Sequence, residues 1–482
     1  MTDQKYNKIK KMNETTISPF YKQDIPADET GGSEIRPLEQ SNDKKSTDCM
    51  TMKHIFEGGT IFDGFLLAAS KEVGQVILTL PYSFSLVGIY SGIFMEVFFA
   101  TLALYTNFLL ISLHAEYRHK INTDTSHPYY NDKHHIVTYT EVITYFVGST
   151  AGKVTRVIIY LSLIGLSTVQ IIATSSNFHI LDDSLSKRDW GLLWGMLFTL
   201  MIFIPNFRHY RFMSVIGIVS TTYTSWFMTT QSNLHGRDSN VTYSAPDTLI
   251  NYFMGFTNIM FTFGGHSSNI EVADVMNDPS TYDRSYLLSY IYVFTLTLPN
   301  AISVYYNFGD DARDDANSFN LFQRSPQRDI GIVLMCLHQM VAFGLFSGPL
   351  YHMWEEYLGI HGSSYHIRVL SRLPIAGAIL FMAIAFPFYG SVNSLLGAFA
   401  MSMATYIIPL LSYNIAFANV DHHKDMVKAP PQWAHIPYMR AVNWFLAGVL
   451  IFAGVGVGGY AAMVKFLRDL DEFEYFAKCY QC

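Results

Sequence analysis

Long apolar runs separated by short polar stretches make up the chain from Phe62 onward. A helix that crosses the hydrocarbon core of a bilayer needs roughly 20 largely apolar residues. Eleven segments meet this requirement and are apolar on every face, which is typical of helices in lipid or in a large buried bundle. The sequence therefore predicts an all-α integral membrane protein with eleven transmembrane helices. The predicted spans are 62–88, 90–113, 152–181, 190–207, 209–231, 247–275, 285–306, 328–356, 371–388, 391–417 and 440–466.

Polar residues dominate the region before the first span. We expect a largely disordered cytosolic leader at 1–56, a transmembrane domain at 57–466 and a short extracellular tail at 467–482. The leader shows no apolar core followed by a small-residue cleavage site, so the first span is expected to serve as the targeting element. Segment 134–149 is too short and too polar to span, and we interpret it as an amphipathic helix on the cytosolic face.

The Lys and Arg residues near the span ends indicate the orientation of the chain. Most of them fall on the cytosolic side when the amino terminus is placed there, which puts the carboxyl terminus outside. The sequon Asn240-Val241-Thr242 then lies on the outer side, after the fifth span, and makes Asn240 a glycosylation candidate. A second sequon at Asn13 falls in the cytosolic leader and should remain unmodified.

The composition agrees with a membrane location and excludes several classes of function. Only 15% of the residues are charged, against about 25% in soluble domains. The net charge of −7 is spread over loops without a basic stripe, so no nucleic-acid partner is expected. The chain has no HExxH motif and no serine elbow, so neither an enzyme nor a bound metal or cofactor is expected. Four cysteines are too few for a disulfide framework, and Cys479 and Cys482 are either one disulfide or two free thiols.

The first predicted span carries charged residues at its centre. It reads IFDGFLLAASKEVGQVILTLPYSFSLVG, with Lys71 and Glu72 in the middle. A Lys or an acid at mid-membrane costs about 2.5–3.5 kcal/mol on insertion scales. The two charges are tolerated if they face a polar cavity and offset each other. Alternatively, Lys71 could extend toward a helix end and reach the membrane surface.

The sixth predicted span is interrupted as well. It reads DTLINYFMGFTNIMFTFGGHSSNIEVADV, with Gly264, Gly265 and His266 at its centre. Paired glycines release the helix and free backbone groups that must then find a ligand or water. Glycine also serves close packing in membrane helices, and a buried histidine can be an ordinary core residue. The position of His266 between two glycines and two downstream acids favours a proton or substrate role.

Two interrupted helices that stand five spans apart are typical of a transporter built from inverted repeats. The substrate site of such a protein lies near the bilayer midplane, between the two breaks. Helix amino termini there offer unpaired N–H groups and partial positive charge, which suit a carboxylate. Neighbouring aromatic side chains can hold an apolar body. The candidates are Tyr223, Trp226, Phe261, Phe263 and Phe343.

Inward transport of an anion works against the negative interior of a cell and costs about 2.3 kcal/mol per 100 mV for each charge. One co-transported proton cancels this cost, and two make the membrane potential a driving force. An imidazole suits this task because it loads and unloads a proton near neutral pH. His266 is therefore the first candidate for proton coupling, and Glu72, a buried carboxyl beside Lys71, is the second.

Strings of residues along most of the chain resemble the auxin influx carriers (the AUX/LAX group) of the amino acid/auxin permease family. The likeness runs from Phe56 to Cys482. The matching strings are QVILTLPYSFS, TTYTSW, FTFGGH, YVFTLTLP, VLMCLHQM, RLP, FPFYGSVNS, YIIPLL and KCYQC. The chain departs from the family pattern at the first break, where Lys71 and Glu72 replace an Asn and a Gln.

The resemblance implies a LeuT-like fold with a 5+5 inverted repeat, broken helices one and six, and alternating access. It implies proton-coupled uptake of indole-3-acetic acid at the plasma membrane, with protons as the coupling ion, and we expect a monomer. By position it places His266 at the substrate and aligns Gln170 and Asn177 with polar residues of span three. The expected substrate-binding residues are Ala69, Ser70, Lys71, Glu72, Gln75, Gln170, Gly264, Gly265, His266, Ser268 and Phe343.

Two other functions remain compatible with the sequence. A proton-coupled amino acid permease of the same fold would need a partner for the ammonium group of its substrate, and Glu72 could supply one. A membrane sensor would bind a ligand without moving it, although the leader is too polar and short to build a signalling domain. Flux into liposomes separates a sensor from a transporter.

Overall fold

The computed structural model describes residues 59–130, 135–204, 210–237, 239–360, 362–420, 422–432 and 434–473. By contacts the chain divides into two units, Met1–Met52 and Lys53–Cys482. The predicted leader at 1–56 lies outside the described residues, as do the sequon at Asn13 and the cysteines Cys49, Cys479 and Cys482. The predicted limits of the three regions therefore stay predictions.

All regular secondary structure within the described residues is helical. The helices are α3 Ile61–Glu72, α4 Val76–Val87, α5 Ile89–Thr123, α6 Tyr139–Val147, α7 Ser149–Leu181, α8 Lys187–Thr199, α9 Tyr210–His235, α10 Leu249–Thr262, α11 Asn269–Asp274, α12 Tyr282–Phe308, α13 Pro326–Tyr357, α14 Tyr365–Ala385, α15 Tyr389–Leu395, α16 Ile408–Ala416, α17 Ile436–Leu450 and α18 Gly459–Phe473. Two π-helical stretches, Leu396–Ile407 and Ile451–Gly458, join α15 to α16 and α17 to α18.

Seven of the described helical segments are long and apolar enough to cross a membrane on their own. They are Ile89–Thr123, Ser149–Leu181, Pro279–Arg313, Pro326–Tyr357, Tyr365–Ala385, Tyr389–Ala416 and Ile436–Glu472. Five of them contain one predicted span each, and the other two end up to three residues before the predicted ends at 388 and 417. The protein is a multi-pass membrane protein. The remaining four predicted spans correspond to shorter, broken or more polar helices, because breaks and polar residues divide their apolar runs.

Both predicted interruptions are present in the structure. The chain leaves the helix between Glu72 and Val76, so the first predicted span comprises α3 and α4. It leaves the helix again after Thr262 and passes through a short 3₁₀ turn, His266–Ser268, before α11 begins. The predicted amphipathic segment 134–149 contains α6, whose amino terminus is capped by the hydroxyl of Thr138.

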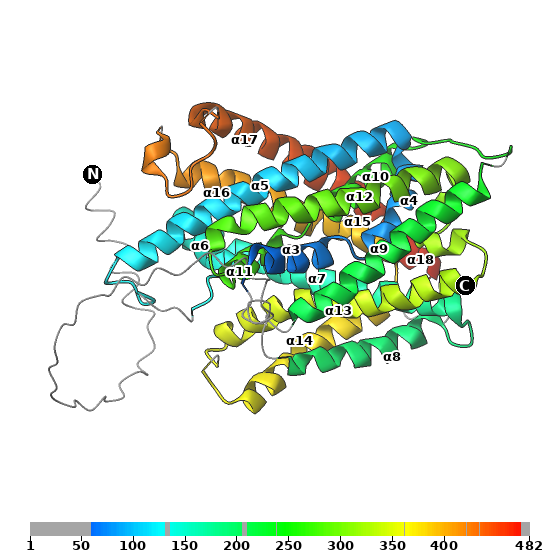
Figure 1. Cartoon of the computed structure of the whole chain (residues 1–482), viewed down its shortest axis with the longest axis horizontal. Helices are drawn as coiled ribbons and strands as arrows, with labels where there is room; N and C mark the ends of the chain where they lie inside the picture. The colour runs from blue at the N-terminus through cyan, green and yellow to red at the C-terminus, as the bar shows by residue number, and fades with distance from the viewer. Residues whose placement is uncertain are drawn as a thin grey trace, which may run out of the picture. The chain divides into compact units, whose positions relative to one another are not determined.

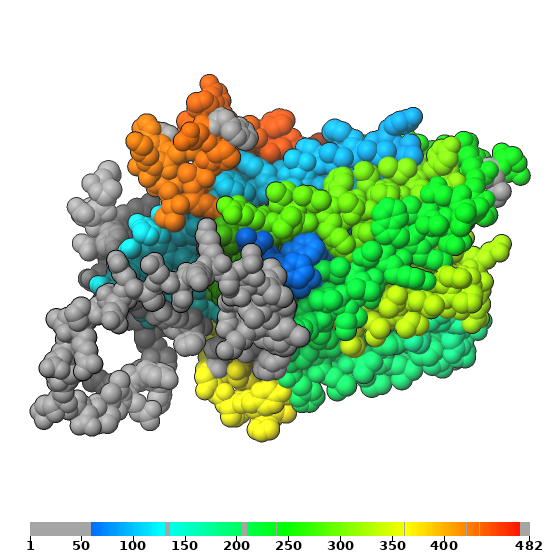
Figure 2. All heavy atoms as spheres, in the orientation of Figure 1, coloured from blue at the N-terminus to red at the C-terminus, as the bar shows by residue number. Residues whose placement is uncertain are grey.

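The broken helices lie inside the bundle and are surrounded by continuous ones (Figure 1). Helix α3 packs against α12 on one side and α9 on the other, and α10 packs against α4. Helix α13 packs along both α7 and α9, while α8 and α14 lie side by side at the lower edge of Figure 1. Figure 2 shows only a small part of α3, in blue, between the green surfaces of its neighbours.

A buried ion cluster joins α13 to α14. The Glu355 carboxylate has no exposed surface and accepts hydrogen bonds from Arg372 Nε at 2.6 Å and Arg368 Nε at 2.7 Å. Arg372 also donates to the carbonyl of Ile202 at 2.6 Å, which ties the end of the fourth predicted span to the same cluster. A buried charge is stable only when its partners are in place, so the cluster fixes the position of α13 relative to α14.

Replacement of Glu355 by Ala should therefore destabilise the protein by about 3–5 kcal/mol, because it leaves the Arg372 guanidinium buried and unpaired. The thermal unfolding midpoint of the purified protein in detergent measures this loss. Arg324→Ala is the control: the Arg324 side chain is 70% exposed and 3.6 Å from Asp329, so its removal should cost less than about 1 kcal/mol. Equal midpoints for the two variants would contradict the structural role of the cluster.

Candidate functional site

Lys71 connects the two helix breaks. Its ammonium group is buried and donates hydrogen bonds to the Gly265 carbonyl at 2.9 Å and the Ser268 hydroxyl at 3.1 Å. It also donates to the Oδ1 atom of Asn269. A lysine has three donors and no acceptor, and the second break supplies three acceptors. The charge predicted at mid-membrane therefore binds the backbone that the paired glycines release.

Glu72 occupies the other side of Gly265. Its carboxylate accepts a hydrogen bond from the Tyr286 hydroxyl at 3.3 Å. A Cβ atom at Gly265 would lie 1.6 Å from Glu72 Oε1, so the carboxylate rests directly against the bare Cα of this glycine. The oppositely charged side chains of Lys71 and Glu72 thus lie on the two sides of Gly265 in the second break. Gly265 is needed there because any side chain would displace the carboxylate.

His266 is completely buried within the same group of residues. Its Nε2 atom lies 3.1 Å from the Ala103 carbonyl and 3.1 Å from the Thr106 hydroxyl, and its Nδ1 atom lies 3.4 Å from the Tyr286 hydroxyl. A carbonyl oxygen only accepts, so this geometry puts a hydrogen on Nε2 and leaves Nδ1 as an acceptor. The Tyr286 hydroxyl therefore stands between Glu72 and His266, the two predicted proton-coupling residues.

A stripe of tyrosines on α12 completes this hydrogen-bonded group. Tyr282 donates to Asn269 Oδ1 at 3.1 Å, and Tyr290 donates to the Phe263 carbonyl at 3.2 Å. The hydroxyls of Tyr286 and Tyr290 are 2.9 Å apart. None of these tyrosines is among the residues predicted for the site. Their spacing was the available signal, since residues four positions apart lie on one face of a helix.

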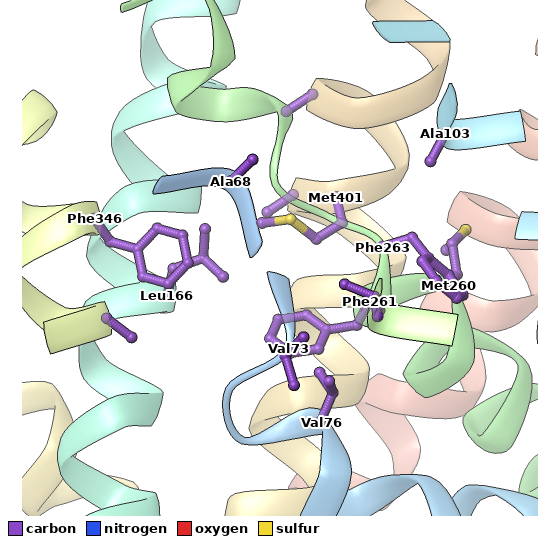
Figure 3. Close-up of a cluster of buried hydrophobic side chains, with 14 of the residues drawn as sticks. Ala68, Val73, Val76, Ala103, Leu166, Met260, Phe261, Phe263, Phe346 and Met401 are labelled. Carbon is purple, nitrogen blue, oxygen red and sulfur yellow. The ribbon is translucent and has the colours of Figure 1, made fainter. Parts of the chain in front are cut away.

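A small cavity of about 20 Å³ lies beside this group. Its polar lining comes from both breaks and from α7, while Leu166, Phe261 and Phe346 form apolar walls. Figure 3 shows Phe346 next to Leu166, and Phe261 beside Val73 and Val76 of the first break. A cavity of this size has room for about one water molecule, so the apolar walls must move apart before a larger ligand can enter.

The amino terminus of α4 opens onto this cavity. Gly74, Gln75 and Val76 all line it, and Gln75 makes no side-chain hydrogen bond to cap the helix. The first N–H groups of a helix are unpaired unless a cap or ligand binds them, and they carry partial positive charge. The Oε1 atoms of Gln75 and Gln170 are buried and have no partner among the described residues. The cavity can therefore bind an anionic group at α4 and a donor group at the two amides.

The structure brings most of the predicted substrate-binding residues together. Six of them line the cavity, and His266 and Ser268 belong to the adjoining hydrogen-bonded group. The six are Lys71, Glu72, Gln75, Gln170, Gly264 and Gly265.

Three other predicted residues lie outside the cavity lining. Ala69 is fully buried, and Ser70 Oγ lies 2.5 Å from where a Cβ of Gly217 would be. Phe343 packs on Phe198, with 5.2 Å between ring centroids, and Phe346 lines the cavity instead.

The remaining candidates are dispersed as well. Among the aromatic candidates, Tyr223 and Trp226 line a different pocket that opens at the surface. Asn240, the glycosylation candidate, is exposed in the loop after α9. The described residues contain no group of three or more His, Cys, Asp or Glu that could hold a metal ion.

Comparison with known proteins identifies the family to which this helical bundle belongs. A family model described as transmembrane amino acid transporter protein matches residues 57–462. The chain belongs to this transporter family. Membership also means that the protein is a transporter and not an enzyme.

Individual relatives are named auxin transporter or auxin transporter-like proteins. Auxin transporter-like protein 1 of Medicago truncatula is 38% identical over 433 residues, which cover 89% of each chain. Auxin transporter-like protein 3 of Arabidopsis thaliana is 38% identical over 446 residues, 92% of this transporter and 93% of the relative. Auxin transporter protein 1 of Arabidopsis thaliana is 36% identical over 467 residues, 95% of each. The resemblance to the AUX/LAX group is thereby confirmed.

Replacement of Gly265 by Ala tests whether transport depends on the positions of Lys71 and Glu72 on the two sides of this residue. The new methyl group would overlap Glu72 Oε1, so the carboxylate must leave Tyr286, and we expect substrate uptake to fall by about tenfold or more. Gly377→Ala on α14 is the matched control, because a Cβ at Gly377 meets no atom within 4 Å. Uptake by both variants is measured at equal amounts of protein in the membrane. Normal uptake by Gly265→Ala would show that the Glu72 position is unimportant.

Proposed function

We propose that this transporter imports an aromatic carboxylate of the indole-3-acetate type together with protons, across the plasma membrane and by alternating access. One observation carries the proposal: the uncapped amino terminus of α4 and Lys71 lie at one cavity, which also has apolar walls. The names of the relatives, which are auxin transporters, support the same class of cargo. The carboxylate would bind at α4, and the ring would lie between Phe261, Phe346 and Leu166.

The proposal includes a complete topology. The fold would be LeuT-like, with eleven spanning helices, a 5+5 inverted repeat, and α3–α4 and α10–α11 as its two broken spans. The amino terminus would be cytosolic and the carboxyl terminus extracellular, as the distribution of Lys and Arg indicates. The transporter domain would cover 57–466, between the leader and the tail, and would act as a monomer. The four predicted spans outside the seven long apolar segments would be shortened or broken because they carry the substrate site or support it.

Charge balance supports the coupling of substrate to protons. Lys71 and Glu72 together are neutral and lie in a buried region with the carboxylate of Glu72 held by Tyr286. A bound carboxylate adds one uncompensated negative charge, which is costly away from water. A proton taken up by His266 or Glu72 would restore neutrality, so binding of the anion and binding of the proton would favour each other. Tyr286, which contacts both residues, would pass the proton between them.

Acidification of the external medium should increase uptake of labelled indole-3-acetate, and His266→Ala should remove this pH response. The reason is that the imidazole would no longer load a proton together with the anion. His266→Gln keeps a donor for the Ala103 carbonyl and controls for loss of the fold. His119→Ala removes an exposed histidine of α5 and should behave as the unmodified protein. Uptake by the His266→Ala variant that still rises in acid would exclude this histidine as the coupling site.

A proton-coupled amino acid permease remains the second candidate, and one observation favours it. The cavity contains the Glu72 carboxylate and the unpartnered Oε1 atoms of Gln75 and Gln170, all of which are acceptors. Acceptors of this kind suit an ammonium group. They also suit the N–H group of an indole ring, which an auxin would supply.

A competition experiment separates the two candidates. Unlabelled indole-3-acetate should compete with the labelled compound, whereas neutral amino acids in equal excess should not. Glu72→Gln should preserve binding of indole-3-acetate, since it removes a negative charge next to the anion, and should weaken binding of any amino acid. Competition by neutral amino acids, together with loss of binding in Glu72→Gln, would overturn the auxin assignment in favour of the permease.

A further inference from the structure

A second polar cavity lies apart from the central one and is lined by residues of α6, α7 and α13. Its volume is about 220 Å³, an order of magnitude more than that of the central cavity. We refer to it as the α6 pocket. Thr138 and Thr140 line it at the start of α6, and Arg156 and Tyr160 line it from α7. The pocket is large enough for a small organic molecule in the observed conformation.

Two buried hydroxyl groups in the α6 pocket have no hydrogen-bond partner among the described residues. They are the Oγ1 atom of Thr140 and the OH of Tyr160. Thr140 as a whole is only 2% exposed. Buried polar groups almost always have a partner, and an unsatisfied one in a cavity indicates a ligand or water. These two hydroxyls therefore mark the α6 pocket as a binding site.

Arg156 and the start of α6 supply positive charge to the α6 pocket. The Arg156 side chain is exposed at its edge and makes no ion pair with any described residue. Thr140 is the second residue of α6, a nine-residue helix, so the positive end of the helix dipole points toward the pocket. A guanidinium binds a carboxylate through two parallel hydrogen bonds and is the side chain best matched to it.

We propose that the α6 pocket binds a small aromatic carboxylate, and that it receives the cargo after the cargo leaves the central cavity. The carboxylate would bind Arg156 and the hydroxyls of Thr140 and Tyr160. The ring would pack against Met353 and Tyr357, which line the opposite side from α13. The inference rests on the proposed function for the identity of the ligand, and the pocket itself is independent of it.

Helix α11 connects the central cavity to the α6 pocket. Asn269, the first residue of α11, binds Lys71. Two residues further on, Glu271 accepts a hydrogen bond from the backbone N–H of Tyr139 at 3.3 Å. Tyr139 stands between Thr138 and Thr140, which line the α6 pocket. Helix α11 thus contacts the first break through Asn269 and the segment that lines the pocket through Glu271, and it is the half-helix that an alternating-access transporter would move.

Glu356 supplies a test of the sign of the ligand charge, because it also lines the α6 pocket. Its carboxylate opposes the binding of an anion and would favour a ligand with an ammonium group. Replacement of Glu356 by Gln should therefore tighten the binding of a carboxylate. The same replacement should weaken the binding of an amino acid.

Equilibrium binding of labelled benzoate and of labelled indole-3-acetate to the full-length protein in nanodiscs tests the proposal. We expect two classes of site in the unmodified protein. Arg156→Gln should weaken one class by about tenfold, since a charge-assisted pair is lost, and Glu356→Gln should tighten the same class. Lys71→Met should affect only the other class. Lys153→Gln, which removes an exposed charge one turn earlier on α7, is the matched control and should bind as the unmodified protein.

The outcomes separate this proposal from the proposed function. A single class of site, or equal binding by Arg156→Gln and Lys153→Gln, would overturn the α6 pocket even if indole-3-acetate is transported. Arg156-dependent binding of benzoate in a protein that does not transport indole-3-acetate would support the pocket and refute the proposed cargo. Arg156-dependent binding of labelled inorganic phosphate, without Arg156-dependent binding of either carboxylate, would show a phosphate or lipid-headgroup site and would overturn the assignment to carboxylates.

Discussion

The Lys71 ammonium group needs hydrogen-bond acceptors, and the second helix break needs donors for its released carbonyl groups. Each supplies the partners of the other. A lysine without partners is costly inside a bilayer, and so is a carbonyl released from its helix. The hydrogen bonds from Lys71 to Gly265, Ser268 and Asn269 satisfy both at once. This interaction holds two segments that are almost 200 positions apart in the sequence, and it determines where α10, α11 and α12 stand relative to the first break.

The same interaction shapes the chemistry that surrounds it. Lys71 is directed into the second break, so Glu72, the next residue, is directed to the other side of Gly265, where Tyr286 binds it. The Tyr286 hydroxyl in turn lies 3.4 Å from His266 Nδ1. A buried hydrogen-bond network stabilises the structure only if each of its groups has a partner. The reason is that an unsatisfied buried polar group costs more free energy than one hydrogen bond contributes. The small cavity beside this network is lined by Gln75 and Gln170, whose Oε1 atoms have no partner among the described residues.

The sequence predicted the breaks well because their cause is local. Glycine weakens a helix wherever it stands. The first break, between Glu72 and Val76, contains Gly74, and the second contains Gly264 and Gly265. The charged pair at 71–72 lies in the last turn of α3, directly before the first break. The sequence predicted side-chain contacts less well, because these depend on the rotation of each helix within the bundle. Phe346 lines the cavity, whereas Phe343, one turn earlier on α13, packs on Phe198. Neither the partners of Lys71 nor the size of the cavity is encoded by any local pattern.

Helix α11 is short and is bonded at both ends. Asn269 at its start binds Lys71, and Asp274 at its end accepts from His114 Nε2 at 3.0 Å, Arg118 Nε at 2.8 Å and the Val137 N–H at 2.8 Å. The first contact belongs to the broken span, and the others belong to α5 and the segment before α6. Movement of α11 must therefore break one set of bonds or carry the neighbouring elements with it. Ile270, Val272 and Ala273 of α11 are buried as well, so any displacement of this helix would cost both these polar contacts and apolar burial.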